Sequence, residues 1–360
     1  MNKLNDDYSR TIDVMRILLI LCVVVLHSFS TAQIPNMSHE YWATAYLFSL
    51  IFGEIGVPGC FFISGFLFFQ SEHFDVSTYK RKLKSRVKSL LIPFLIWNSI
   101  MIFVYFLLQS IPSLSQFASG VVKDFGDMSA VDFIRLYWDR GDWNEGNGMP
   151  VLGPYWYIRN LMMLVLISPV IMLFMKYLKY WLLIPLIALW MLDDSLAFSA
   201  SSLLFFTMGG IMWMQHLEIL KLCQKYRYVL HTLGLVSVMA DLYFHVFDTT
   251  TFELYIHRTT LIVGLFWLLL ISKNLASKVS HVETLASLSF FIYTIHHPLI
   301  SVLKKLQIKF VNSDSALTQI LLYWTMIVVT VLICTAIYRA LNKCMPKLLS
   351  ISMGSRIVKR

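Results

Sequence analysis

Two ionisable side chains, Arg16 and His27, lie within the first apolar segment of the chain. A charge at the centre of a membrane helix costs roughly 2.5–3.5 kcal/mol on insertion scales, so each such residue is a functional candidate. Their spacing places both on one helix face, about 16 Å apart along the axis. Asp13, three residues before Arg16, is close enough to neutralise part of its charge. We expect this face to border protein or water, either as part of a reaction pathway or as a polar seam that only locks helices together.

A second pair of candidates, Tyr293 and His296, lies in an apolar segment near the C-terminus. Residues three apart share a helix face, whereas the next residue, His297, points about 100° away. We therefore expect at most one of the two adjacent histidines to share a cavity with Tyr293. No carboxylate or cysteine accompanies these histidines at ligand spacing, so the sequence predicts no metal site.

Glu54 lies in a stretch rich in glycine and proline, residues 53–59, which precedes the aromatic run of residues 61–66. Glycine and proline break a regular helix, and within a membrane a break survives only where protein or a cavity satisfies the freed backbone groups. We therefore expect the stretch to border something other than lipid. Alternatively, these glycines and Gly65 are close-packing sites between helices.

Six of the nine residues from Lys80 to Lys88 are cationic, including Arg81 and Arg86. Arg and Lys are the usual binders of phosphate, so this run would attract a ligand with several phosphates. The alternative is an anchor on anionic lipid, worth about 1 kcal/mol per cation near the surface.

The elements that must position these residues are membrane helices. The chain is 57% hydrophobic and only 14% charged, and its mean hydropathy is +0.65. A helix that crosses a bilayer needs about 20 apolar residues, and such runs recur along the whole chain. We predict an all-α polytopic membrane protein, one domain over 1–360 with its core at 11–342. The ten predicted spans are 12–32, 45–69, 87–110, 154–175, 180–193, 199–216, 228–246, 258–272, 284–304 and 316–338.

The positive charges predict how the chain is oriented. The formal net charge is +9, but the cations lie in short clusters between apolar runs, which indicates membrane topology and no nucleic-acid partner. Most of them fall on one side of the predicted spans, which is the cytoplasmic side by the positive-inside rule. We therefore expect both termini in the cytoplasm, a basic tail at 343–360, and an outer loop at 111–153. That loop either covers a site for an acceptor or is a solvated loop.

In this order, the motifs resemble those of the integral-membrane acyltransferase family 3 across residues 11–300. The matching segments are Arg16 with His27, Phe61–Phe66, Pro154–Ile158 with Ser168-Pro169, Phe205–Gly210 and Phe291–His296. One departure concerns the family's Arg-x-x-Arg motif, where this chain has Arg86 and then Ser89. Lys88 is the candidate replacement for the second arginine.

The resemblance implies a bacterial inner-membrane enzyme that moves an acyl group, usually acetyl, from cytoplasmic acyl-CoA to a hydroxyl of a surface glycan or lipid-linked sugar. It implies no bound cofactor; its partners would be acyl-CoA, the glycan acceptor and membrane lipid. His27 would act as general base or acyl carrier, and Arg16 would orient the donor. CoA phosphates would bind Arg81, Arg86 and Lys88, and the acceptor side would be lined by Tyr293, His296, Trp156 and Glu54.

Two other functions remain possible from the residues alone. Intramembrane Arg and His residues also suit a transporter or flippase for lipid-linked saccharides. Few carboxylates lie within the spans to form an acidic relay for such a carrier. A structural subunit of a glycan-synthesis complex would need a degenerate site, which the intact Arg16 and His27 argue against.

Overall fold

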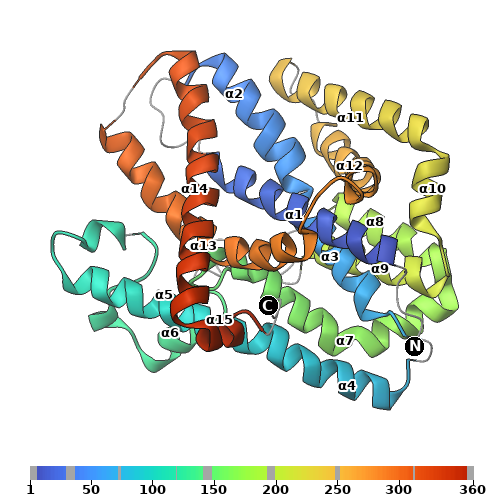
Figure 1. Cartoon of the computed structure of the whole chain (residues 1–360), viewed down its shortest axis with the longest axis horizontal. Helices are drawn as coiled ribbons and strands as arrows, with labels where there is room; N and C mark the ends of the chain where they lie inside the picture. The colour runs from blue at the N-terminus through green and yellow to red at the C-terminus, as the bar shows by residue number, and fades with distance from the viewer. Residues whose placement is uncertain are drawn as a thin grey trace.

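The computed structural model describes residues 6–29, 37–71, 74–118, 120–140, 148–192, 199–247, 252–310 and 313–354, and these residues form helices and no strand (Figure 1). In chain order they are α1 (Asp6–Ser28), α2 (His39–Ala45), η1 (Tyr46–Phe52), α3 (Gly56–Phe68), α4 (Val76–Arg86), η2 (Val87–Leu91), α5 (Ile92–Ser110), η3 (Ser115–Phe117), η4 (Phe125–Asp127), α6 (Ala130–Arg135), η6 (Gly153–Tyr155), α7 (Trp156–Leu178), η7 (Lys179–Leu182), α8 (Leu183–Leu192), α9 (Ala200–Met214), α10 (Ile219–Lys225), α11 (Arg227–Phe247), α12 (Glu253–Ala276), α13 (Val282–Phe310), α14 (Ala316–Cys344) and α15 (Pro346–Ser352).

The all-α membrane architecture is confirmed, with a slightly smaller number of spans. Within the described ranges, eight helical segments are long and apolar enough to cross a membrane, and the pair α9 and α10, bent by 95°, would make nine. The predicted spans 154–175 and 180–193 form one helical run, Gly153–Leu192, and the predicted span 199–216 belongs to the bent pair. The turn η7 keeps its backbone hydrogen-bonded there although Lys179 has a φ of 51°.

The outer helix faces suit lipid. Large apolar side chains stand exposed on α5, α7, α11 and α14, among them Phe103, Val170, Val236 and Leu332. Contiguous apolar surface of this kind is rare on a soluble monomer but is what a hydrocarbon solvent requires.

Helix α1 lies near the centre of the molecule (Figure 1), in contact with α3, η1, α12, α13 and α14. It runs parallel to α13, because Val14 clusters with Val282 near one end and His27 meets His296 near the other. Parallel helices in a membrane must be separated by an odd number of crossings. With the eight segments as the crossings, an odd number of them lies between α1 and α13, so the condition is satisfied. A ninth crossing by α9 and α10 would make that number even and the two helices antiparallel.

Glycines set the closest helix contacts. A Cβ on Gly65 of α3 would overlap the carbonyl oxygen of Phe206 in α9, and a Cβ on Gly209 would overlap that of Phe62. The two backbones touch here, as in other membrane helix pairs with small residues at the crossing. The close-packing interpretation of Gly65 is therefore the one that the structure supports.

The break predicted at 53–59 takes the form of the π-helix η1 followed by a turn at Ile55. Its glycines face α1: a Cβ on Gly53 would lie 3.0 Å from the Cβ of Leu26, and one on Gly56 would lie 2.8 Å from a methyl group of Val23. The break thus borders protein, as expected, and the backbone on either side of Glu54 lies against α1.

The described part of the predicted basic tail, residues 343–354, is folded. Helix α15 turns back onto α5, where the Trp97 indole N–H donates to the carbonyl oxygen of Ser352 at 3.0 Å. Gly354, with a φ of 62°, lies against the backbone of Ser89. Residues 355–360 lie outside the described residues.

Parts of the predicted outer loop are also packed against the helices. The Val151 N–H donates to the Leu136 carbonyl at 2.7 Å, and the Leu152 N–H donates to the Asn98 side chain at 3.1 Å. Asn98 is completely buried in α5, so the loop is fixed to the bundle at that point. Between the two ends, the described residues include the short helix α6, which begins with a capping box.

Candidate active site

A cavity of about 480 Å³ lies between α1, α3, α7 and α13 and reaches the junction of α4 with η2. It brings together three of the predicted site residues, Arg16, Arg86 and Tyr293. The other polar residues in its lining are Asp13, Ser64, Tyr157, Glu283, Ser287 and Ser289. A volume of this size suits the elongated arm of a ligand whose remaining part lies outside.

One end of the cavity is ionic. Arg16 forms an ion pair with Asp13 at 2.6 Å, as the sequence predicted, and keeps 42% of its side chain exposed. Arg86 stands over the ring of Phe68, 5.8 Å from its centroid, and contributes the second guanidinium. Two guanidinium groups from helices distant in sequence therefore line the same cavity.

Helix α4 holds the cations by ordinary helix chemistry. The Asp75 carboxylate caps its first turn and accepts from the Thr78 N–H at 2.8 Å, a bond that lowers the pKa of Asp75 to about 2. Lys82 donates to the carbonyl oxygens of Phe68 and Gln70 at the end of α3, at 2.5 and 3.1 Å. The helix that ends at Arg86 is thereby tied to the helix that lines the cavity.

Tyrosines close the other end of the cavity. The Tyr293 hydroxyl donates to the Pro154 carbonyl oxygen, and its ring stacks on Tyr155 with centroids 5.8 Å apart. The Tyr157 hydroxyl lies 3.0 Å from the Ser64 hydroxyl. These contacts hold the aromatic start of α7 against α3 and α13, which explains the motif at residues 154–158.

Three histidines gather one helical turn beyond Tyr293. The ring of His27 lies 5.2 Å from that of His296 and 4.9 Å from that of His297, between centroids. The Tyr293 ring is 6.1 Å from His296. Tyr293 lines the cavity and neither His296 nor His297 is among the lining residues, which agrees with the expectation of at most one. His27 in α1 faces both histidines, which spacing within α13 could not reveal.

The end of the docked loop lies against one histidine of this cluster, His297. A Cβ on Gly153 would lie 3.8 Å from the imidazole of His297 and 3.9 Å from the sulfur of Met149. Lys304, one turn further along α13, donates to the Phe29 carbonyl at 2.7 Å and ties α13 to the end of α1. The end of the loop therefore lies beside His297.

Four predicted site residues lie elsewhere. Arg81 and Lys88 are exposed on α4 and η2 and are not part of the cavity lining. Trp156 packs against Phe61, with centroids 6.1 Å apart, behind the lining. Glu54 is on the side of α1 that faces α11 and α12.

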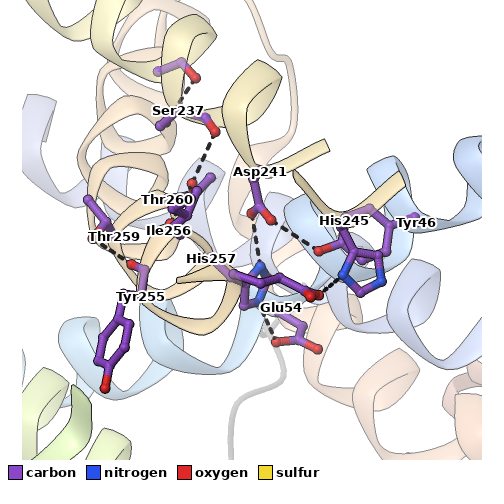
Figure 2. Close-up of polar contacts among 12 residues, drawn as sticks. Tyr46, Glu54, Ser237, Asp241, His245, Tyr255, Ile256, His257, Thr259 and Thr260 are labelled. Atoms are coloured by element: carbon purple, nitrogen blue, oxygen red, sulfur yellow. Dashed lines mark hydrogen bonds and ion pairs between the residues drawn. The ribbon is translucent and has the colours of Figure 1, made fainter. Parts of the chain in front are cut away.

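There Glu54 belongs to a polar network that the sequence did not reveal (Figure 2). The His257 ring lies between two carboxylates: Nδ1 is 2.9 Å from Asp241 and Nε2 is 3.0 Å from Glu54. Asp241 also accepts from the Tyr46 hydroxyl at 3.0 Å, and its side chain is completely buried. His245, stacked on Tyr46, completes the group. The intramembrane carboxylates Glu54 and Asp241 were the available signals, but members of the network are up to 203 positions apart in the chain.

We expect this network to stabilise the packing of η1 on α11 and α12. In His257→Ala the buried Asp241 carboxylate keeps only Tyr46 of these partners, and breaking a buried pair in this way costs about 3–5 kcal/mol. Thermal unfolding of the purified protein in detergent should show a clear loss of stability. The control is Thr259→Ala. Thr259 is exposed on the same helix, and its hydroxyl donates only to the Tyr255 carbonyl oxygen of that helix. Equal melting temperatures for both variants would contradict the prediction.

The described residues contain no group of three or more His, Cys, Asp or Glu side chains arranged to hold a metal ion. The ionisable and polar side chains described at the site carry imidazole, guanidinium, hydroxyl and carboxylate groups.

Comparisons with known proteins give one family and one relative. A family model described as an acyltransferase domain matches residues 10–339. The succinoglycan biosynthesis protein ExoH of Rhizobium meliloti (strain 1021) is 25% identical over 365 residues, a match that covers 98% of this chain and 94% of the relative. No solved structure matches the chain significantly.

Proposed function

Because the chain belongs to the acyltransferase domain family and is a multi-pass membrane enzyme, we propose that it transfers an acetyl group from cytoplasmic acetyl-CoA to a hydroxyl of a cell-envelope glycan or lipid-linked sugar. In this proposal it is a bacterial inner-membrane enzyme with both termini in the cytoplasm. The ionic end of the cavity then faces the cytoplasm, and the docked loop lies on the outer side.

The proposal rests on one observation: the cavity and the histidine cluster follow one another along the same face of α1. Arg16 and Arg86 stand at one end of the cavity, and His27 lies beyond the other end on the same helix face as Arg16. Guanidinium groups bind phosphates well, and an elongated cavity suits a pantetheine arm. A donor held this way points its thioester toward His27.

The reaction needs few groups. A hydroxyl oxygen of the acceptor replaces the sulfur of CoA on the acyl carbon, so that an ester and a free thiol are formed. His27 takes part either by accepting the hydroxyl proton or by carrying the acyl group. Arg16 binds the donor phosphates or the acyl carbonyl, and Tyr293 lies between the donor cavity and the histidines.

The relative supports a carbohydrate acceptor, because its name places it in succinoglycan biosynthesis. Family membership favours the enzyme over the transporter that the intramembrane charges alone allowed.

A comparison of surface glycans tests the proposal. Mass spectrometry of glycans from cells with and without this protein should show a mass of acetyl size that is lost on deletion and restored by the wild-type gene. Identical glycan masses would refute the proposed transfer. A lost mass of another size would refute acetyl as the group transferred.

We expect Arg86 to contribute to donor binding. Arg86→Gln removes one charged hydrogen-bonding group, worth about 1.5–3 kcal/mol, so KM for acetyl-CoA should rise about 10- to 100-fold while kcat changes little. The matched control is Lys84→Gln, an exposed cation on the same helix. A similar change in KM for both variants would indicate a general electrostatic effect instead.

A further inference from the structure

The two ring nitrogens of His296 have different surroundings. Nδ1 lies 2.7 Å from the carbonyl oxygen of Tyr293 and 3.0 Å from that of Ile292. A carbonyl oxygen only accepts hydrogen bonds, so Nδ1 carries the ring hydrogen and donates it. Nε2 therefore presents a lone pair.

That lone pair has no partner. His296 is completely buried, and its Nε2 finds no hydrogen-bond donor within the part of the chain that the structure describes. Leaving a buried acceptor unsatisfied costs about 1–3 kcal/mol, and folded proteins rarely retain one without a reason. A donor that arrives with a substrate, such as a sugar hydroxyl, would satisfy it.

His27 differs from His296 in its burial and in its hydrogen bonding. His27 is half-buried, whereas His296 is fully buried; the His27 ring lies against His296 and His297, and no described residue is hydrogen-bonded to it as Tyr293 is to His296. It extends from the face of α1 that lines the cavity, so an acyl group held in the cavity would lie along the same helix face as His27. A base is typically oriented by a third group, and a nucleophile must be accessible.

We propose that the two histidines divide the reaction: His27 carries the acyl group, and Nε2 of His296 accepts the proton of the acceptor hydroxyl. The inference rests on the proposed acyl transfer and decides between the two roles considered for His27.

The first step forms the acyl-enzyme. A ring nitrogen of His27 attacks the thioester carbon, the carbon–sulfur bond breaks, and the CoA thiolate takes the proton from the other ring nitrogen. In the second step the acceptor hydroxyl attacks the acyl carbon and gives its proton to Nε2 of His296. The carbon–nitrogen bond breaks, and the departing His27 nitrogen regains a proton from His296. Both rings end neutral, and the products are an ester and free CoA.

The two half-reactions can be measured separately. Exchange of tritiated CoA into acetyl-CoA reports the first step without an acceptor, and label transfer from acetyl-CoA to membrane glycan reports both steps. The test variant is His296→Asn, because its amide nitrogen can still donate to Tyr293 while the position of Nε2 is lost. His296→Gln, which places a non-basic amide near that position, is the second variant. The control is Ser301→Ala, whose hydroxyl bonds only its own helix at His297.

We expect both His296 variants to retain exchange within a factor of about three and to lose transfer by about 10²-fold or more. His27→Ala should lose both activities, and Ser301→Ala neither. A wild-type enzyme that transfers label without exchange would overturn the acyl-carrier role of His27. If a His296 variant melts like the wild type but loses exchange and transfer together, the division of roles is wrong. A wild-type enzyme with neither activity would refute acetyl-CoA as the donor, and with it this inference.

Discussion

Replacing His27 by alanine is expected to lower acyl transfer by about 10²- to 10⁴-fold while the protein still inserts into the membrane and folds. Losing a general base or a nucleophile costs a factor of this size, because the remaining site can only hold the substrates near each other. Removing a partly exposed imidazole should cost little stability, since its described contacts are ring contacts with His296 and His297.

The measurement is label transfer from acetyl-CoA to glycan in membranes that contain equal amounts of each variant. His39→Ala is the matched control, because His39 is exposed at the start of α2. Activity in His27→Ala within threefold of the wild type would show that this imidazole does not take part in the reaction.

Replacing Gly65 by valine is expected to prevent correct folding. A Cβ at this position would overlap the backbone carbonyl of Phe206, and backbone cannot yield as the end of a flexible side chain can. Overpacking a core costs typically 1–3 kcal/mol and more where no rearrangement is available, so we expect a loss of at least about 3 kcal/mol. The segments 61–66 and 205–210 would both lose their packing, because each supplies one side of the contact between α3 and α9.

The measurement is the yield of monodisperse protein from detergent extracts and its melting temperature. The control is Gly126→Ala, in the surface part of the loop. The added Cβ would lie 3.4 Å from a carboxylate oxygen of Asp124, its nearest described neighbour. A Gly65→Val protein that melts like the wild type would show that α3 and α9 are not in backbone contact.

Local periodicity predicted the parts of the site that lie on single helices. The positions of Arg16 and His27 on one face of α1, the ion pair of Arg16 with Asp13, and the direct contact of Tyr293 with His296 all follow from 3.6 residues per turn. The apolar runs likewise predicted the membrane helices, whose hydrogen bonds are internal to each segment.

Contacts between distant segments could not be obtained in this way. The meeting of His27 with His297, and of Glu54 with His257, depends on which helices pack together, which one chain's periodicity does not specify. Arg81, Arg86 and Lys88 look alike in sequence, yet only Arg86 lies in the cavity lining. The outer loop carried no strong pattern, although its Leu152 N–H is bonded to the buried Asn98 side chain of α5.

The central claim is that the donor binds on the cytoplasmic side and that the acyl group reaches the acceptor through His27. Inverted and right-side-out vesicles from the same cells, each supplied with labelled acetyl-CoA in the external medium, test this directly, because CoA esters do not cross the bilayer. We predict that label enters membrane glycan in inverted vesicles with the wild-type protein, and in neither vesicle type with His27→Ala. Incorporation by right-side-out vesicles, or by inverted vesicles containing His27→Ala, would contradict the account.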